Sequence, residues 1–383
     1  MAHAVETTLL LKELVSRPSV NPMGRQLPAE ITLEHRVTAY LEEFFLGLGV
    51  RWERQPVAPQ RENIVAYFES PGARRTYVWE AHQDTVPIDH MTIEPFGAVI
   101  ANGKLSGRGS CDIKGGMACM LGAFARLVRE KPKEAANVIM ACTVDEEFTF
   151  LGVQRLAKSL RADCAIVAEP TQLKIVQAHK GVARWYVQTG GRACHASSPQ
   201  LGVNAIYRMG RVLTAIEQYA AELQRSRSDP LLGPPTLSVG IITGGTSANT
   251  VPDRCRIEVD RRLIPGEDMQ AAPRQLEEFL RTRAGLDFPV EVTPPWLAAP
   301  ALGPAGSEAL IQQLGAAIAA SRGSFEVTAV PYGTDASTIA EAGIPAVVFG
   351  PGDIAQAHTC DEWVDLGEVE LASEILFRLA IAG

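Results

Sequence analysis

The sequence lacks any apolar run that approaches the roughly 20 residues needed to span a bilayer. Its first apolar stretch is too short for a signal peptide and is broken by Glu6, Lys12 and Glu13. This stretch is better interpreted as an amphipathic helix whose leucines face inward. We therefore expect no membrane partner and a cytoplasmic location.

An excess of basic residues and closely paired cysteines are also missing. Lys and Arg number 36 against 44 Asp and Glu, and the formal net charge is −8. A nucleic-acid partner usually leaves a basic patch, so this balance argues against nucleic-acid binding. The seven cysteines are odd in number and none is spaced Cys-x-x-Cys, so we expect reduced thiols and no zinc finger.

The residues that are present are those of an ordinary globular protein, with 46% hydrophobic and 21% charged residues. A chain of 383 residues is long enough for two domains of roughly 100–200 residues each. No internal repeat or low-complexity segment is evident. The pattern of apolar residues therefore has to show where one domain gives way to the other.

Strands and helices alternate in the first and last parts of the chain. Early elements are predicted as helix 35–48, strands 63–68 and 76–81, a helix from 115 to about 129, strand 137–144, helix 152–160 and strand 164–168. Late elements are predicted as helix 307–320, a short helix after Thr334, strand 345–349 and a last helix from about Glu368. This order predicts an α/β domain with a mostly parallel sheet covered by helices.

A different order of elements lies between these parts. We predict strand 182–189, helix 204–224, strands 236–242 and 254–264, helix 269–282 and strand 288–293. The order β-α-β-β-α-β is that of the ferredoxin-like split unit. The sequence thus predicts one domain of residues 1–181 and 298–383 that is interrupted by an α+β domain of residues 182–297.

Five groups of acidic and histidine residues follow predicted strands or lie in the loops after them. They are centred on His82 with Asp84, on Asp112, on Glu146 with Glu147, on Glu169, and on His358. In open α/β sheets, ligands bind beyond the carboxyl ends of the strands, so the five groups point to one site.

Each group has an ordinary interpretation when it is taken alone: a surface histidine, a solvated turn or the cap of a strand. The glycine-rich loop 107–116 could be a simple connector, and it lacks the spacing of a phosphate-binding fingerprint. Together, however, two histidines and three or four carboxylates are what a binuclear zinc hydrolase needs. The mixed nitrogen and oxygen donors favour zinc over calcium or magnesium.

The groups and their order resemble the M20 metallopeptidase family, which includes acetylornithine deacetylase, succinyl-diaminopimelate desuccinylase, aminoacylase and glutamate carboxypeptidase. The resemblance covers essentially the whole chain. The acetylornithine deacetylase branch is the most similar in the motifs Ala168-Glu-Pro-Thr, His179-Lys-Gly, Asp260-Arg-Arg-Leu-Ile-Pro-Gly and the stretch from Gly333-Thr-Asp-Ala to Asp361-Glu-Trp. It implies a zinc-peptidase-like α/β/α catalytic domain, with residues 182–297 as a lid and dimerisation domain.

The resemblance also implies a ligand set for two Zn²⁺ ions per chain. His82 and Glu169 would bind one ion, Glu147 and His358 would bind the other, and Asp112 would bridge them with a cis peptide bond after it. Co²⁺ or Mn²⁺ could substitute for zinc.

The other implied roles are catalytic or concern the substrate. Glu146 would be the general base, Asp84 would orient His82, and His195 would polarise the scissile carbonyl, in the site of a partner subunit. The residues Asn249, Arg262, Gly333 and Thr334 would bind the substrate. One departure from the family pattern is Glu80, which could adjust substrate preference or face solvent.

These roles imply hydrolysis of the amide bond of a small N-acyl amino acid, of the N-acetylornithine type, by a homodimer. A desuccinylase, a general aminoacylase and a dipeptidase or carboxypeptidase of the same family remain alternatives. A catalytically silent binding or scaffold protein is a further alternative of another class. It is disfavoured because all six positions from His82 to His358 keep a ligand or a base.

Overall fold

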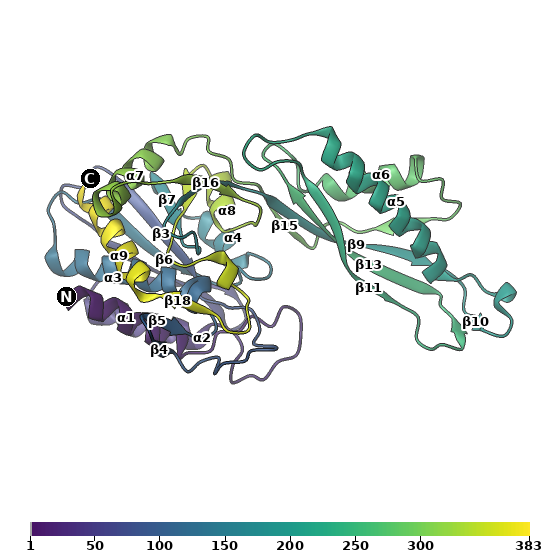
Figure 1. Ribbon diagram of the computed structural model, residues 1–383, viewed down its shortest axis with the longest axis horizontal. Helices are drawn as coiled ribbons and strands as arrows, with labels where there is room; N and C mark the ends of the chain where they lie inside the picture. Colours follow the sequence, from purple (N-terminus) through teal and green to yellow (C-terminus); the bar gives the residue numbers. More distant parts are fainter. Residues whose placement is uncertain (1) are drawn as a thin grey trace. The chain divides into compact units, whose positions relative to one another are not determined.

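A computed structural model describes the chain from residue 2 to residue 383, and its side chains from Thr7 onward. The chain forms two compact units (Figure 1). The large unit consists of the chain up to Gln177 together with Pro304–Thr328 and Thr334–Gly383. The small unit consists of Ala178–Gly303 and Ala329–Gly333.

An eight-stranded sheet forms the centre of the large unit. Its order is β1 (Arg51–Ala58), β2 (Arg61–Phe68), β6 (Asn137–Thr143), β3 (Thr76–His82), β7 (Cys164–Val167), β17 (Ala346–Val348), β8 (Ile175–His179) and β16 (Val327–Val330). The four strands from β6 to β17 are parallel, which confirms the predicted α/β sheet. Antiparallel pairs extend it on both sides, where β2 joins β6 and β8 joins β17.

Helices cover both faces of this sheet (Figure 1). One face carries α1 (Ala2–Val15), α2 (His35–Leu48), α3 (Gly115–Glu130), α7 (Glu308–Arg322) and α9 (Leu366–Ile381). Alternate residues of β3 separate the faces, because Tyr77 and Trp79 join this core whereas Val78 does not. The contacts of α4 (Leu151–Ala157) and α8 (Ala336–Glu341) are with each other and with strands of the sheet. None of the helices between residues 2 and 383 is long and apolar enough to cross a membrane.

Single capping residues mark the ends of several helices. Asp365 caps α9 by accepting a hydrogen bond from the Glu368 backbone N–H, and Asn204 caps α5 (Ala205–Ser226) in the same way. Gly49 ends α2 with a φ of 69°, a conformation that costs glycine little.

A three-stranded sheet of β18 (Trp363–Asp365), β5 (Lys104–Ser106) and β4 (Val99–Ala101) joins two distant parts of the large unit. Its register places Trp363 opposite Ser106 and Asp365 opposite Lys104. The segment after His358 therefore lies against the loop that carries Asp112.

The small unit is built on an antiparallel sheet of order β11 (Thr236–Gly244), β13 (Arg254–Leu263), β9 (Gly181–Gly190) and β14 (Val290–Val292). Its core holds Trp185 and Val259 from the sheet, Val212 from α5, and Leu276 from α6 (Ala272–Thr282). This is the predicted α+β insertion with its split order of elements. Short strands extend it: β15 (Leu297–Ala299) pairs with β9, and β10 (Cys194–His195) pairs with β12 (Thr250–Val251).

Candidate metal centre

Three parallel strands of the large unit end side by side, and acidic or histidine residues follow each of them. His82 is the last residue of β3, Glu169 comes shortly after β7, and Glu146 and Glu147 come shortly after β6. Because β3 pairs in parallel with both β6 and β7, the structure brings these four side chains to one edge of the sheet.

Loops supply the two remaining groups. Asp112 lies in an irregular turn, Ser110–Lys114, that leads from β5 into α3, and its peptide bond to Ile113 is cis. His358 follows a short 3-10 turn, Ile354–Gln356, that comes after β17.

The first cluster consists of His82, Asp112 and Glu169, with one ligand atom of each within 4.8 Å of the others. His82 Nε2 lies 3.3 Å from Asp112 Oδ1 and 4.0 Å from Glu169 Oε1. All three side chains are buried. They supply one imidazole nitrogen and two carboxylates to a single point.

The second cluster consists of Asp112, Glu147 and His358 and meets the same distance criterion. His358 Nε2 lies 3.3 Å from Asp112 Oδ2 and 3.3 Å from Glu147 Oε2. The His358 side chain is 53% exposed, so this cluster is the more open of the two. Asp112 belongs to both clusters and turns one carboxylate oxygen towards each histidine.

Glu146 lies beside the first cluster, with its Oε2 atom 4.0 Å from His82 Nε2. Burial and the nearby carboxylates of Glu169 and Glu147 raise the pKa of Glu146 well above its usual range. A carboxylate with a raised pKa is suited to accept a proton and to release it later.

The donor set fits two divalent cations. Among the side chains from Thr7 onward, His82 Nε2 and Glu147 Oε1 are buried polar atoms without a hydrogen-bond partner. Burial and the Asp112 carboxylate raise the pKa of Glu147 to about 7, and they also raise the pKa of Glu169. Positive ions between these groups would offset the repulsion among the buried carboxylates. A set of imidazole and carboxylate donors is one that suits zinc.

The two histidines lie in a strongly negative environment. Burial alone would lower the pKa of His82, but the adjacent carboxylates of Asp112 and Asp84 outweigh burial and raise the pKa well above its ordinary value. Asp112 and Glu147 raise the pKa of His358 to about 11. Protons therefore compete with a cation for both ring nitrogens.

Asp84 connects His82 to the loop that carries Glu146 and Glu147. His82 Nδ1 lies 3.0 Å from the Asp84 carbonyl oxygen and 3.6 Å from its carboxylate, so the carbonyl is the nearer acceptor. The Asp84 carboxylate accepts hydrogen bonds from the backbone N–H groups of Glu146 and Glu147, each at 3.2 Å. Its further partner is the Asn21 side chain, at 2.8 Å.

A buried guanidinium lies behind this loop. Arg61 Nη1 donates to Asp145 Oδ1 at 2.5 Å, and the same side chain pairs with Glu34. Asn21 Nδ2 also donates to Asp145, at 2.9 Å. Arg61 and Asn21 were not predicted from the sequence, and Asp145 was noted only as one of three consecutive acids after a strand. A charge at the start of an apolar strand was the available signal for Arg61.

Glu80 does not face solvent, because only 1% of it is exposed. Thr143 Oγ1 lies 2.5 Å from Glu80 Oε1 and 3.1 Å from Asp335 Oδ2. Burial raises the pKa of Glu80 to about 7, and burial with the Glu80 carboxylate raises the pKa of Asp335. Glu80 lies on the strand that ends at His82, two residues before it, and its carboxyl group forms a buried acidic pair with that of Asp335.

The predicted lid residues lie at two separate places in the small unit. His195 pairs with Thr250 across β10 and β12, and the Ala196 N–H donates to the Asn249 carbonyl at 2.9 Å. His195 and Asn249 are both exposed, and the structure brings them together.

Arg262 lies near the other end of β13, roughly 25 Å along the strand from Arg254 at about 3.3 Å per residue. Its Nε atom donates to Asp260 Oδ1 at 2.8 Å. Within the small unit, the structure does not bring Arg262 to Asn249.

Gly333 and Thr334 lie between β16 and α8. Thr334 is buried, and its Oγ1 atom accepts a hydrogen bond from the Ala336 N–H at 3.2 Å. They directly precede Asp335, the partner of Glu80.

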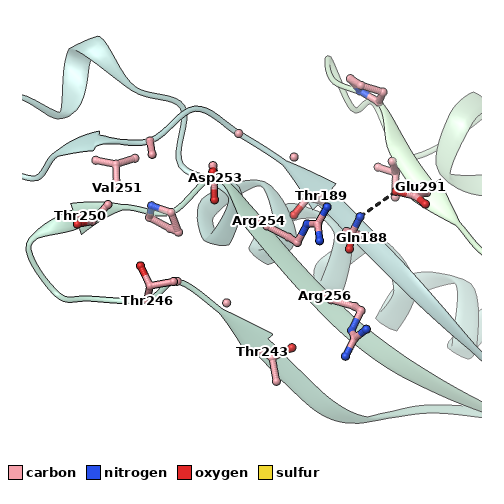
Figure 2. Close-up of a pocket in the computed structure, with 18 residues that line it drawn as sticks. Gln188, Thr189, Thr243, Thr246, Thr250, Val251, Asp253, Arg254, Arg256 and Glu291 are labelled. Atoms are coloured by element: carbon pink, nitrogen blue, oxygen red, sulfur yellow. Dashed lines mark hydrogen bonds between the residues drawn. The ribbon is translucent and has the colours of Figure 1, made fainter.

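A pocket of about 1120 Å³ lies in the small unit and is lined by ends of β9, β11, β13 and β14 (Figure 2). Gln188 Nε2 donates to Glu291 Oε2 at 2.8 Å, and the guanidinium of Arg256 lies 4.5 Å from the ring centre of Tyr186. None of the described residues that line this pocket belongs to either cluster. The candidate ligands therefore lie outside this pocket.

Comparison with known proteins agrees with this geometry. Residues 78–382 match the model of peptidase family M20/M25/M40. The chain is 33% identical over 328 residues to the acetylornithine deacetylase of Myxococcus xanthus, covering 83% of each chain. It is 30% identical over 376 residues to the acetylornithine deacetylase of Erwinia tasmaniensis, covering 97% of this chain and 96% of the relative.

Solved structures share the fold. A tripeptidase from Staphylococcus aureus has a TM-score of 0.80 at 21% identity, covering 99% of this chain and 98% of the other. A dinuclear metal-binding peptidase from Bacillus subtilis has a TM-score of 0.71 at 18% identity, covering 100% and 98%. The chain belongs to peptidase family M20/M25/M40 and is a metal-dependent hydrolase of that family.

Proposed function

We propose that the chain hydrolyses the amide bond of a small N-acyl amino acid, with N-acetylornithine as the first candidate substrate. The observation that carries this proposal is the pair of clusters that share Asp112, with Glu146 beside them. The deacetylase relatives from two bacteria support the choice of substrate.

In this proposal, His82 and Glu169 bind one zinc ion, Glu147 and His358 bind the other, and Asp112 binds both. The support is that each cluster offers three donor atoms within 4.8 Å of one another. Metal analysis of the purified protein should find two zinc ions per chain, with Co²⁺ or Mn²⁺ able to replace them. A protein that binds less than one ion would contradict the assignment.

In this proposal Glu146 would carry the proton that moves from the attacking water to the leaving amine. When bound, zinc acts as a Lewis acid that acidifies a water molecule and polarises the scissile carbonyl. Glu146 accepts the proton of the attacking water and passes it to the leaving amine. Its burial favours this role, because a raised pKa allows the carboxyl to hold the proton between the two steps.

Replacement of Glu146 by alanine tests the general base. The Glu146→Ala variant should keep its zinc and lose about 10²- to 10⁴-fold in kcat on N-acetyl-amino acids, because no other side chain is assigned to the proton. The matched control is Glu43→Ala, an exposed glutamate on α2, which should leave kcat unchanged. Near-wild-type turnover by zinc-loaded Glu146→Ala would remove Glu146 from the mechanism.

The small unit would supply the lid. His195 would polarise the carbonyl in a partner's site, and Asn249, Arg262, Gly333 and Thr334 would hold the substrate. The guanidinium of Arg262 suits a carboxylate because of its planar fork. Asp260 accepts its Nε–H here, so a substrate would join an existing ion pair.

Dimerisation through the small unit is part of the same proposal. Strand β11 lies at an edge of the sheet, and Ile241 and Ile242 on it are 55% and 53% exposed. Exposed apolar edge strands tend to pair with another chain. Light scattering should give twice the mass of one chain, and Ile242→Lys should lower that mass.

A kinetic panel decides the substrate. N-acetylornithine, N-succinyl-diaminopimelate, N-acetylmethionine and a few dipeptides would be compared by kcat/KM. We expect N-acetylornithine to give the highest value. A preference for another compound would move the chain to a different activity within its family, and no turnover of any compound by zinc-loaded protein would favour a binding role.

A further inference from the structure

The loop before Asp112 has backbone N–H groups that no regular helix or strand pairs. Gly107 and Gly109 have φ values of 151° and 81°, which residues with a side chain rarely adopt. A Cβ atom on Gly109 would come within 2.5 Å of Thr85 Cγ2. The loop is therefore tightly packed, and its amide groups need an internal acceptor.

Glu362 supplies this acceptor with both oxygens of its carboxylate. Oε1 accepts from the backbone N–H groups of Cys111 and Asp112 at 2.9 and 3.0 Å. Oε2 accepts from the Gly109 N–H at 2.9 Å and from Arg108 Nη1 at 2.7 Å. Four charge-assisted hydrogen bonds thus connect the Glu362 side chain to four residues of the loop between Arg108 and Asp112.

Water cannot replace this carboxylate at low cost. Glu362 is fully buried, and the Arg108 side chain is 2% exposed. Removing the acceptor would leave three buried N–H groups and one guanidinium unsatisfied. The loop would have to move to find other partners.

The position of Asp112 depends on one of these bonds. Its own N–H donates to Glu362, which fixes the backbone from which its carboxylate extends. That carboxylate lies 3.3 Å from a ring nitrogen of both His82 and His358. Glu362 also belongs to the segment that follows His358, so it ties two loops of the centre together.

We infer that Glu362 is a positioning residue of the metal centre, which holds Asp112 at the point where it can serve both ions. The inference rests on the proposed function, since it assumes that Asp112 is the shared ligand. Glu362 does not touch an ion or the substrate in this proposal. It acts through the backbone of Asp112.

The test compares the Zn²⁺ affinity of metal-free full-length protein with and without this carboxylate, by competition with a chelator. Glu362→Gln should weaken zinc binding by about 10- to 100-fold, the usual effect of a residue that supports a ligand. The glutamine amide presents N–H groups where the loop needs an acceptor. A matched control is Phe45→Leu, a fully buried change on α2 that should lower the melting temperature without changing zinc affinity.

A double-mutant cycle separates positioning from general destabilisation. In an Asp112→Asn background, Glu362→Gln should cause little further loss of zinc affinity, because Glu362 acts on zinc binding only through the Asp112 carboxylate, which is already absent. Additive losses would show that Glu362 acts elsewhere. Wild-type zinc affinity in folded Glu362→Gln would also overturn the inference.

A third variant keeps the inference testable when the glutamine variant folds poorly. If Glu362→Gln does not fold, Glu362→Asp keeps the charge on a shorter side chain, and we expect a smaller loss that Asp112→Asn again masks. Full zinc affinity of Glu362→Asp would contradict the inference. Failure of the proposed function gives different results: the unaltered protein would then bind no zinc, or would bind zinc without hydrolysing any compound of the kinetic panel.

Discussion

At the residue scale, Arg61 shows how a buried charge can support the loop that carries Glu146 and Glu147 through a single contact, with Asp145. Its guanidinium pairs with Asp145 and Glu34, and its Nη2 lies 4.0 Å from Asp84. Asp145 directly precedes Glu146 in the chain. Removing one partner from a buried ion pair is costly because the other charges remain buried.

Replacement of Arg61 by methionine should therefore destabilise the fold by about 3–5 kcal/mol in urea unfolding. Arg61→Lys should recover part of this, because it keeps the charge but loses the planar fork. Arg54→Met on the neighbouring strand is the control, since Arg54 pairs with Glu42 and Glu62 near the surface and should cost at most about 1 kcal/mol. Equal effects of the two methionine variants would refute the prediction.

His179 makes stability depend on pH. It is fully buried, and burial lowers its pKa from 6.5 to about 4. Between these values the unfolded chain binds a proton that the folded chain does not, so stability is complete above pH 6.5 and falls as the pH drops towards 4. His179→Gln removes this proton, and the free energy of unfolding of the variant relative to the wild type should rise by up to about 3 kcal/mol between pH 7.5 and pH 4.

Denaturant titrations of both proteins at several pH values measure this difference. The comparison cancels carboxylates that titrate in the same range. A constant difference across the range would contradict the prediction.

The candidate metal ligands could be identified from residue type alone. Residues whose role depends on burial could not. His82 and His358 stand out because histidines near acidic residues suggest a ligand set. Arg61 and Glu362 look like ordinary charges in sequence, and only the fold shows that they are enclosed. Glu80 was noticed as a departure from the family, but its partner Asp335 lies more than 250 residues away in the chain.

At the element scale, the start of α4 is packed against the loop that carries Glu146 and Glu147. A Cβ atom on Gly152 would lie 2.2 Å from the Val144 carbonyl oxygen and 2.8 Å from Asn63 Oδ1. Asn63 in turn accepts from the Val144 N–H at 3.2 Å. The close approach of helix and loop therefore requires glycine.

Gly152→Ala should lower both stability and kcat, although alanine favours helix by up to about 1 kcal/mol. Gly47→Ala in α2 is the control, because nothing lies within 4 Å of its added Cβ atom, and it should be neutral or slightly stabilising. Thermal unfolding and turnover of both variants test this. A Gly152→Ala protein as stable and active as the control would show that the loop tolerates displacement.

The strongly periodic elements were predicted closely. Helix α5 runs from Ala205 to Ser226 where 204–224 was expected, and α3 runs from Gly115 to Glu130 where 115 to about 129 was expected. Strand β1 was missed because charged and amide side chains interrupt the apolar residues of its sequence, RWERQPVA, and it lies at the edge of the sheet. The three-residue strands β4, β5 and β18 are too short to leave a periodic pattern.

At the scale of the whole molecule, bound metal should stabilise the large unit alone, since both clusters lie within it. Ligands that bind only the folded state stabilise it by about 4 kcal/mol at 1,000 times the dissociation constant. Calorimetry of zinc-loaded and chelator-treated full-length protein should show one transition shifted to lower temperature without metal and another unchanged. Identical thermograms would argue against resident ions.

The class of fold and the nature of the centre were accessible from the order of elements and residue types. The exact substrate was not, because loops rather than the order of elements determine it, and the cytoplasmic location remains a prediction. The antiparallel pairing of β2 with β6 and of β8 with β17 was not foreseen either, since pairing across about 70 or more residues leaves no local pattern.

The insertion of residues 178–303 determines when the centre can be completed during synthesis. Strand β17 lies between β7 and β8 in the sheet but leaves the ribosome only after the inserted segment has been made. His358 emerges later still, and the nascent chain until then carries only the histidine and carboxylates of the first cluster together with Glu147. Domains tend to fold in the order in which they emerge, so in the proposed centre a second cation would be loaded among the last events in the maturation of this protein.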